Sequence, residues 1–174
     1  MKSTGEIQRQ MPAWLQVLTL ETFMSRELVT KILNHALSRL IEEQAELLDL
    51  GVTERTLSHH LARYLAQFFP EGYHVDVEYN RHGEDPKRLN LPPRRALDRE
   101  LRATTVFPDI LVHKRNTNDM NLLVLEMKKP GEAIEYDEIK LKAFRSELGY
   151  SHAAHIILGK DNGNVIRTVI WVDD

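Results

Sequence analysis

Cysteine is absent from the 174-residue chain, which excludes disulfide bridges, thiolate zinc centres and a cysteine nucleophile. No apolar run approaches the roughly 18 to 20 residues that a helix needs to span a membrane, so we expect no membrane partner. The sequence also lacks a Gly-x-Ser-x-Gly elbow, a Walker phosphate loop and a Gly-x-Gly-x-x-Gly motif. Serine hydrolase, nucleoside-triphosphatase and dinucleotide-binding functions therefore have no support.

The overall charge is not that of a strongly basic nucleic-acid-binding protein. The formal net charge is −3, with 42% hydrophobic and 28% charged residues. This balance argues against non-specific nucleic-acid binding but leaves room for a local basic groove. The length favours one domain. The short apolar stretch at 13–24 is interrupted by polar residues and does not resemble a signal peptide, so we expect a cytoplasmic protein.

Two helices are predicted in the first part of the chain. Apolar residues recur at three- and four-residue spacing from Ser25 to about Asp49, and again from Thr53 to about Phe69. Ser25 and Thr53 are suitable N-caps, and Pro70 is a suitable stop signal. Both segments are therefore expected to bury one face.

Beyond these helices the hydrophobic period changes from about 3.6 to 2, which indicates strands. The pattern predicts a strand, a charged loop, two strands, a helix and two final strands, at 73–79, 80–104, 106–113, 121–128, 133–147, 153–159 and 164–172. The fold class is therefore α/β, with a mixed sheet flanked by helices.

The pattern with most chemical content lies on the two middle strands. Asp109 follows Pro108 at the start of one apolar run, and the next apolar run ends in Glu126 and Lys128. Strand side chains alternate between faces, so Glu126 and Lys128 project from the same side as Val124. Burying an acid and a lysine is unfavourable unless they are paired or bind a metal.

If the two strands pair, the carboxylates of Asp109 and Glu126 could converge. They would then supply the hard oxygen ligands that Mg²⁺ or Mn²⁺ prefers. A bound ion would polarise a phosphoryl oxygen and lower the pKa of a coordinated water. Lys128 could orient or deprotonate that water, or stabilise developing negative charge. The alternative is an exposed ion pair between Glu126 and Lys128, which contributes about 0–1 kcal/mol.

Pro108-Asp109, followed after sixteen intervening residues by Glu126-x-Lys128, resembles the motif of the PD-(D/E)XK nuclease superfamily. That resemblance implies a restriction-endonuclease-like fold with an αβββαβ core, an order that the predicted elements between 53 and 159 reproduce. It divides the single domain into an N-terminal helical extension, 1–52, and a nuclease-like α/β core, 53–174. The resemblance also implies that Asp109, Glu126 and the Met127 backbone carbonyl are metal ligands and that Lys128 is catalytic.

Many members of that superfamily add a glutamate from the first core helix, and Glu54 is the best match. It continues the inward stripe of Leu57 and Leu61. The alternative is a first-turn acid stabilised by the helix dipole beside Thr53. Glu78, at the end of the first strand, is a rival third carboxylate.

A basic loop precedes the motif strands. Between 81 and 102 lie seven basic and four acidic residues. Such a loop could grip phosphates, or it could be an ordinary solvated surface. The candidate nucleic-acid contacts are Arg81, Lys87, Arg88, Arg94 and Arg95 in this loop, with Lys140 from the helix after the motif.

The sequence as a whole predicts a Mg²⁺- or Mn²⁺-dependent nuclease that acts on nucleic acid, with DNA the favoured substrate. The alternative is a catalytically idle module of the same fold that binds nucleic acid or a protein partner. The apolar stripe of the helix at 25–49 could mediate a homodimer or pack on the chain's own core. Substrate shape and sequence specificity do not follow from the sequence.

Overall fold

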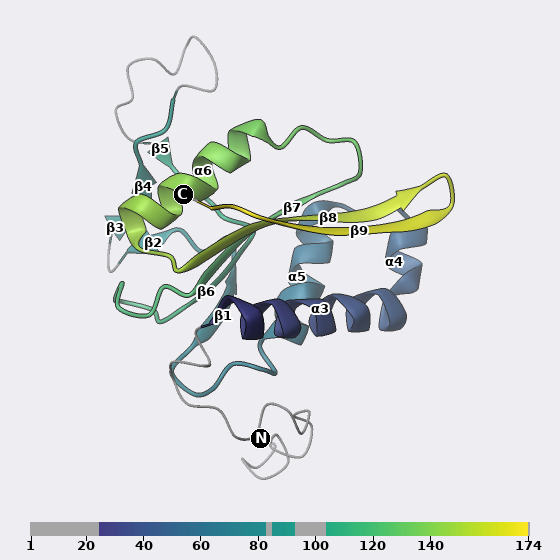
Figure 1. The fold of residues 1–174 in the computed structure, drawn as a ribbon, viewed down its shortest axis with the longest axis horizontal. Helices are drawn as coiled ribbons and strands as arrows, with labels where there is room; N and C mark the ends of the chain where they lie inside the picture. The colour runs from purple at the N-terminus through teal and green to yellow at the C-terminus, as the bar shows by residue number, and fades with distance from the viewer. Residues whose placement is uncertain (1–24, 83–84, 93–103, 174) are drawn as a thin grey trace.

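The protein is an α/β structure built on one mixed five-stranded sheet (Figure 1). The computed structural model describes residues 25–82, 85–92 and 104–173. The sheet runs in the order β1-β6-β7-β8-β9, and β7 and β8 form its parallel pair while the other neighbours are antiparallel. Its strands are β1 (His74–Val77), β6 (Ile110–His113), β7 (Leu123–Lys128), β8 (His152–Asp161) and β9 (Asn164–Trp171).

Helices cover both faces of this sheet, as Figure 1 shows, with α3 and α5 on one side and α6 on the other. The predicted N-caps of α3 and α5 are confirmed. The side chains of Ser25 and Thr53 accept hydrogen bonds from the backbone N–H groups of Leu28 and Thr56, respectively. The helices are α3 (Arg26–Glu43), α4 (Ala45–Asp49), α5 (Glu54–Leu65) and α6 (Glu135–Leu148).

Several element boundaries differ from the predicted ones. The predicted helix at 25–49 breaks at Gln44 into α3 and α4. The strand predicted from 106 begins only at Ile110, because Pro108 has no N–H to donate to a strand partner. The segment predicted as a loop holds two small antiparallel pairs, β2 (Arg81–His82) with β3 (Asp85–Pro86) and β4 (Arg88–Leu89) with β5 (Thr104–Thr105).

Alternation along β7 decides which side chains enter which core layer. Leu123, Leu125 and Met127 belong to the layer with α3 and α5, and Val124 belongs to the layer with α6. Glu126 and Lys128 therefore lie on the α6 side, as the two-residue period predicts. The main elements α5, β1, β6, β7, α6 and β8 follow one another in the predicted order.

The apolar stripe of α3 is buried within the chain. Its seven buried residues, from Leu28 to Leu40, pack in the same layer as α5 and the sheet. This stripe is consequently not available for the helix-mediated homodimer considered above. The apolar stretch at 13–24 lies outside the described residues.

The ring of Pro130, two residues after the end of β7, lies close to Gly159 in β8. A Cβ placed on Gly159 would lie 2.7 Å from the Cδ of Pro130, so we expect Gly159→Ala to destabilise the fold by about 1–3 kcal/mol through overpacking. Urea unfolding measures this loss. Pro130→Ala in the same chain should restore part of it, and an unchanged loss in the double variant would show that the Pro130 contact is not the cause.

Candidate active site

The two halves of the predicted motif are hydrogen-bonded to each other. Ile110 lies opposite Leu125 in the β6–β7 register, so Asp109 comes opposite Glu126. The Met127 backbone N–H donates to Oδ2 of Asp109 at 2.6 Å. The sheet therefore brings Asp109 to the end of β7 that carries Glu126 and Lys128.

Helix α6 contributes two further charged side chains to this place. Nζ of Lys140 lies 2.7 Å from Oε2 of Glu126 and 3.3 Å from Oδ1 of Asp137. Nζ of Lys128 lies 2.9 Å from Oδ2 of Asp137. Asp137 and Lys140 are three residues apart and so lie on one helix face. The two motif side chains are thus each ion-paired to α6.

Glu54 joins the same cluster from the first turn of α5. Its carboxyl group hydrogen-bonds Glu132 and interacts electrostatically with Lys128 and Asp109. Its Oε1 atom is buried without a hydrogen-bond partner, as is Oε1 of Glu126. The rival Glu78 lies apart from this group, because it is ion-paired to Arg55 at 2.7 Å.

The cluster carries more carboxyl than ammonium groups. With every group ionised its formal charge is −3, from the carboxylates Glu54, Asp109, Glu126, Glu132 and Asp137 and the ammonium groups Lys128 and Lys140. This excess of negative charge favours the binding of a cation, and the two buried, unpartnered glutamate oxygens are ligand atoms of the type that Mg²⁺ and Mn²⁺ prefer. The residues present therefore fit the expected ion chemically.

Burial shifts Glu126, Glu54 and Asp109 toward their protonated forms, whereas at Asp137 burial is outweighed by Lys128 and Lys140, which lower the pKa of that carboxyl. It raises the pKa of Glu126 to about 8, with Lys140 opposing the shift and Asp109 adding to it. Burial and the hydrogen bond with Glu132 raise the pKa of Glu54 to about 7. Burial also raises the pKa of Asp109, against the Met127 N–H. Perturbed carboxyl groups that converge in this way are typical of functional sites.

The described residues do not form a preorganised set of ligands for the predicted metal ion. Within 25–82, 85–92 and 104–173, no group of three or more histidine, aspartate or glutamate side chains is arranged to hold a metal ion. Lysines occupy the positions next to two of the carboxylates instead. Metal binding thus remains a prediction that rests on residue chemistry.

His155 is a neighbour that sequence reasoning missed. It lies beside Glu126 in the parallel β7–β8 register, is fully buried, and neither ring nitrogen has a hydrogen-bond partner. Burial lowers its pKa, so the ring is neutral at pH 7. Asp137 was also missed as a site residue. Its only sequence signal was the three-residue spacing to Lys140, which any charged helix face can show.

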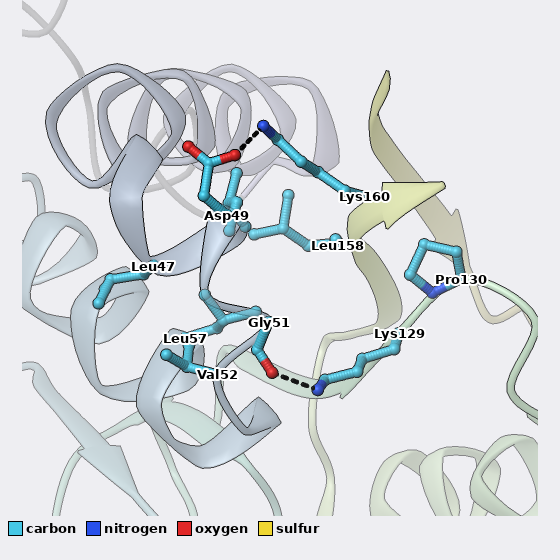
Figure 2. A pocket seen from close by; sticks show the side chains of 11 residues that line it. Leu47, Asp49, Gly51, Val52, Leu57, Lys129, Pro130, Leu158 and Lys160 are labelled. Atoms are coloured by element: carbon cyan, nitrogen blue, oxygen red, sulfur yellow. Dashed lines mark hydrogen bonds and ion pairs between the residues drawn. The ribbon is translucent and has the colours of Figure 1, made fainter. Parts of the chain in front are cut away.

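Lys129 faces away from the cluster and lines a separate cavity (Figure 2). Its Nζ donates to the Gly51 carbonyl at 2.9 Å, and Lys160 forms an ion pair with Asp49 at the rim. The cavity measures about 380 Å³, and the apolar residues Leu47, Val52, Leu57, Pro130 and Leu158 form part of its wall beside Lys129 and Lys160. The alternation that places Lys128 in the cluster thus removes Lys129 from it.

The predicted phosphate contacts other than Lys87 divide into three groups. Arg81 and Arg88 are exposed, as a phosphate contact requires. Lys140 is paired to Glu126 within the cluster rather than presented to solvent. Arg94 and Arg95 lie outside the described residues.

Lys87 differs most from its predicted role. It is only 3% exposed, lies over the rings of Tyr79 and Tyr150, and its Nζ is 3.4 Å from the Tyr150 hydroxyl. Burial lowers its pKa to about 8. An ammonium enclosed in this way is not placed for a phosphate at the surface.

The raised pKa of Glu126 predicts a pH-dependent stability. A carboxyl whose pKa is higher in the folded state stabilises that state below its unfolded pKa of 4.5, and this contribution is lost as pH rises toward 8. The quantity to follow is the difference in free energy of unfolding between the metal-free wild type and Glu126→Gln. We expect the wild-type value to fall relative to that of the variant as pH rises across this interval. Urea unfolding at several pH values measures the difference. Glu135→Gln, at an exposed position of α6, is the control, and parallel pH profiles for wild type and Glu126→Gln would contradict the prediction.

Comparisons with known proteins add no relative. No protein-family model matches the sequence, and no curated protein and no solved structure matches it. Among the described helices, none combines the length and apolar character needed to cross a membrane.

Proposed function

We propose that this chain is a Mg²⁺- or Mn²⁺-dependent nuclease of the PD-(D/E)XK type that hydrolyses phosphodiester bonds, with DNA as its favoured substrate. The observation that supports this proposal most is the convergence of Asp109, Glu126 and Lys128 at one end of the β6–β7 pair. The raised carboxyl pKa values and the unpartnered oxygens of the cluster add to it.

The residues at the site have different roles in this proposal. Asp109, Glu126 and the Met127 carbonyl would hold the ion, and Glu54 would support it or its water. When bound, the ion would polarise the phosphoryl oxygen and lower the pKa of a coordinated water. His155 lies fully buried beside Glu126 and would help keep bulk water from this carboxylate.

Lys128 acts as a fixed positive charge in this scheme. Burial alone would lower the pKa of its ammonium, but the hydrogen bond and charge of Asp137, together with the charges of Glu54 and Glu126, outweigh burial and raise it. A lysine with a raised pKa is a poor general base at neutral pH. Stabilisation of the negative charge that develops on the phosphoryl group, and orientation of the attacking water, are therefore the roles that we assign to it.

A second candidate function is that of a binding module without catalysis. This function is favoured by the pairing of Lys128 and Lys140, because both lysines of the cluster already form ion pairs with carboxylates of the chain. In that case the fold would bind DNA or a protein partner through its surface, without turnover. DNA binding through Arg81 and Arg88 would weaken as salt concentration rises, because phosphate contacts release counterions.

Cleavage of labelled single-stranded, double-stranded and branched DNA, and of RNA, distinguishes the two functions. Each substrate is incubated with Mg²⁺, Mn²⁺ or EDTA. The nuclease proposal expects cutting of at least one substrate with metal and none with EDTA. Folded protein that retains DNA without cutting it in either metal would favour the binding module. Equal cutting in EDTA would contradict the metal requirement.

A further inference from the structure

The ammonium group of Lys140 lies among the carboxylates that are proposed to hold a metal ion. Its Nζ is 2.7 Å from Glu126 and 3.3 Å from Asp137, and it interacts electrostatically with Asp109. Only 13% of the Lys140 side chain is exposed, and 4% of the Glu126 side chain. This contact is therefore largely shielded from solvent. Opposite charges attract more strongly in such an environment than in water.

The position of this ammonium makes it a competitor for a bound cation. A divalent ion between Asp109 and Glu126 would use the Glu126 oxygen that Lys140 now contacts, or would lie next to the lysine charge. Like charges at such a separation repel, and more so when water is largely excluded. The two cations therefore exclude each other at Glu126.

Asp137 provides an alternative position for the displaced lysine. Its Oδ1 atom is already 3.3 Å from Nζ of Lys140, and its Oδ2 atom accepts from Lys128. A flexible lysine side chain can move from Glu126 toward Asp137 without a shift of α6. Displacement would thus leave Lys140 paired rather than isolated.

We propose that Lys140 is an internal counter-cation that a divalent ion must displace from Glu126, so that this lysine lowers the affinity of the site for metal. This inference rests on the proposed function, because it assumes that Asp109 and Glu126 hold the ion. It assigns Lys140 to the control of metal binding, in place of the phosphate contact predicted from the sequence.

Helix α6 supplies a matched control two residues away. Lys142 is paired with Glu138 at 2.8 Å, and both side chains are about half exposed. Lys142→Met removes the same charge and the same atoms as Lys140→Met, but at the solvent face of the helix. A general effect of net charge on metal binding would appear in both variants.

The test is Mn²⁺ binding without nucleic acid, measured from the electron paramagnetic resonance signal of free Mn²⁺. Wild type, Lys140→Met and Lys142→Met are titrated at equal protein concentration, after circular dichroism in EDTA shows that each is folded. We expect Lys140→Met to bind Mn²⁺ about tenfold or more tightly than wild type. Lys142→Met should match wild type. Glu126→Gln in the Lys140→Met chain should abolish the gain.

Three other outcomes separate this inference from the proposed function. Equal or weaker Mn²⁺ binding by Lys140→Met would show that the lysine does not compete, and would leave the nuclease proposal standing. Absence of Mn²⁺ binding in every variant would overturn both the inference and the metal requirement of the proposed function. Tighter binding without cleavage would preserve the inference and reject the nuclease. If Lys140→Met does not fold, Lys140→Gln, which keeps a polar group without the charge, replaces it in the same titration.

Discussion

Replacement of Lys128 by methionine is expected to slow metal-dependent cleavage by about 10²–10⁴-fold, the range seen when a positioned catalytic group is lost. Methionine keeps most of the side-chain volume and removes the charge that Asp137 holds in place. The loss should appear in the rate of single-turnover cleavage at saturating metal and substrate, because it affects the transition state more than binding. DNA binding should change little.

Lys129→Met is the control for this prediction. Lys129 is the next residue, but its side chain faces the opposite side of the sheet and contacts the Gly51 carbonyl. Its replacement should leave the single-turnover rate close to that of wild type. A folded Lys128→Met protein that cleaves at the wild-type rate would contradict the role assigned to Lys128.

Replacement of Phe144 by alanine is expected to destabilise the protein by about 3–5 kcal/mol, as for other buried phenylalanines. Phe144 is fully buried and packs in the α6 layer with Leu111 and Val124. Its ring meets that of Tyr150 edge to face, with 5.6 Å between the centroids. Truncation would leave a cavity under the helix that carries Asp137 and Lys140. Urea unfolding of the metal-free protein measures the loss.

Ile139 on the same helix provides the comparison. Its side chain is 43% exposed, so Ile139→Ala should change the free energy of unfolding by less than about 0.5–1 kcal/mol. Similar losses for the two variants would show that α6 is not anchored through Phe144. Loss of the Lys128–Asp137 pairing in a folded Phe144→Ala protein would in addition lower the cleavage rate.

The face of β7 that carries the motif could be predicted from the sequence. Strand alternation depends only on backbone geometry, so the shared face of Val124, Glu126 and Lys128 followed once the strand was recognised. The same alternation accounts for the position of Lys129, the next residue, on the other face. The predicted α/β class with a mixed sheet is confirmed for the same reason, since hydrophobic period distinguishes strands from helices.

The partners of the motif could not be predicted in the same way. The contacts of Lys128 with Asp137 and of Glu126 with Lys140 join a strand to a helix that packs on it. Such contacts depend on how the two elements are placed, which no local pattern encodes. The burial of His155 and of Lys87 has the same origin, because each residue is enclosed by segments distant in sequence.

The most direct test of a divalent-cation site at this cluster is anomalous diffraction from crystals of the protein soaked in Mn²⁺. We expect an anomalous peak between the carboxylates of Asp109 and Glu126, near the Met127 carbonyl, with Lys140 moved away from Glu126. The peak should disappear in Glu126→Gln crystals. Manganese bound only elsewhere, or a Lys140–Glu126 pair that persists at saturating Mn²⁺ without a peak, would show that Asp109 and Glu126 do not form a metal site.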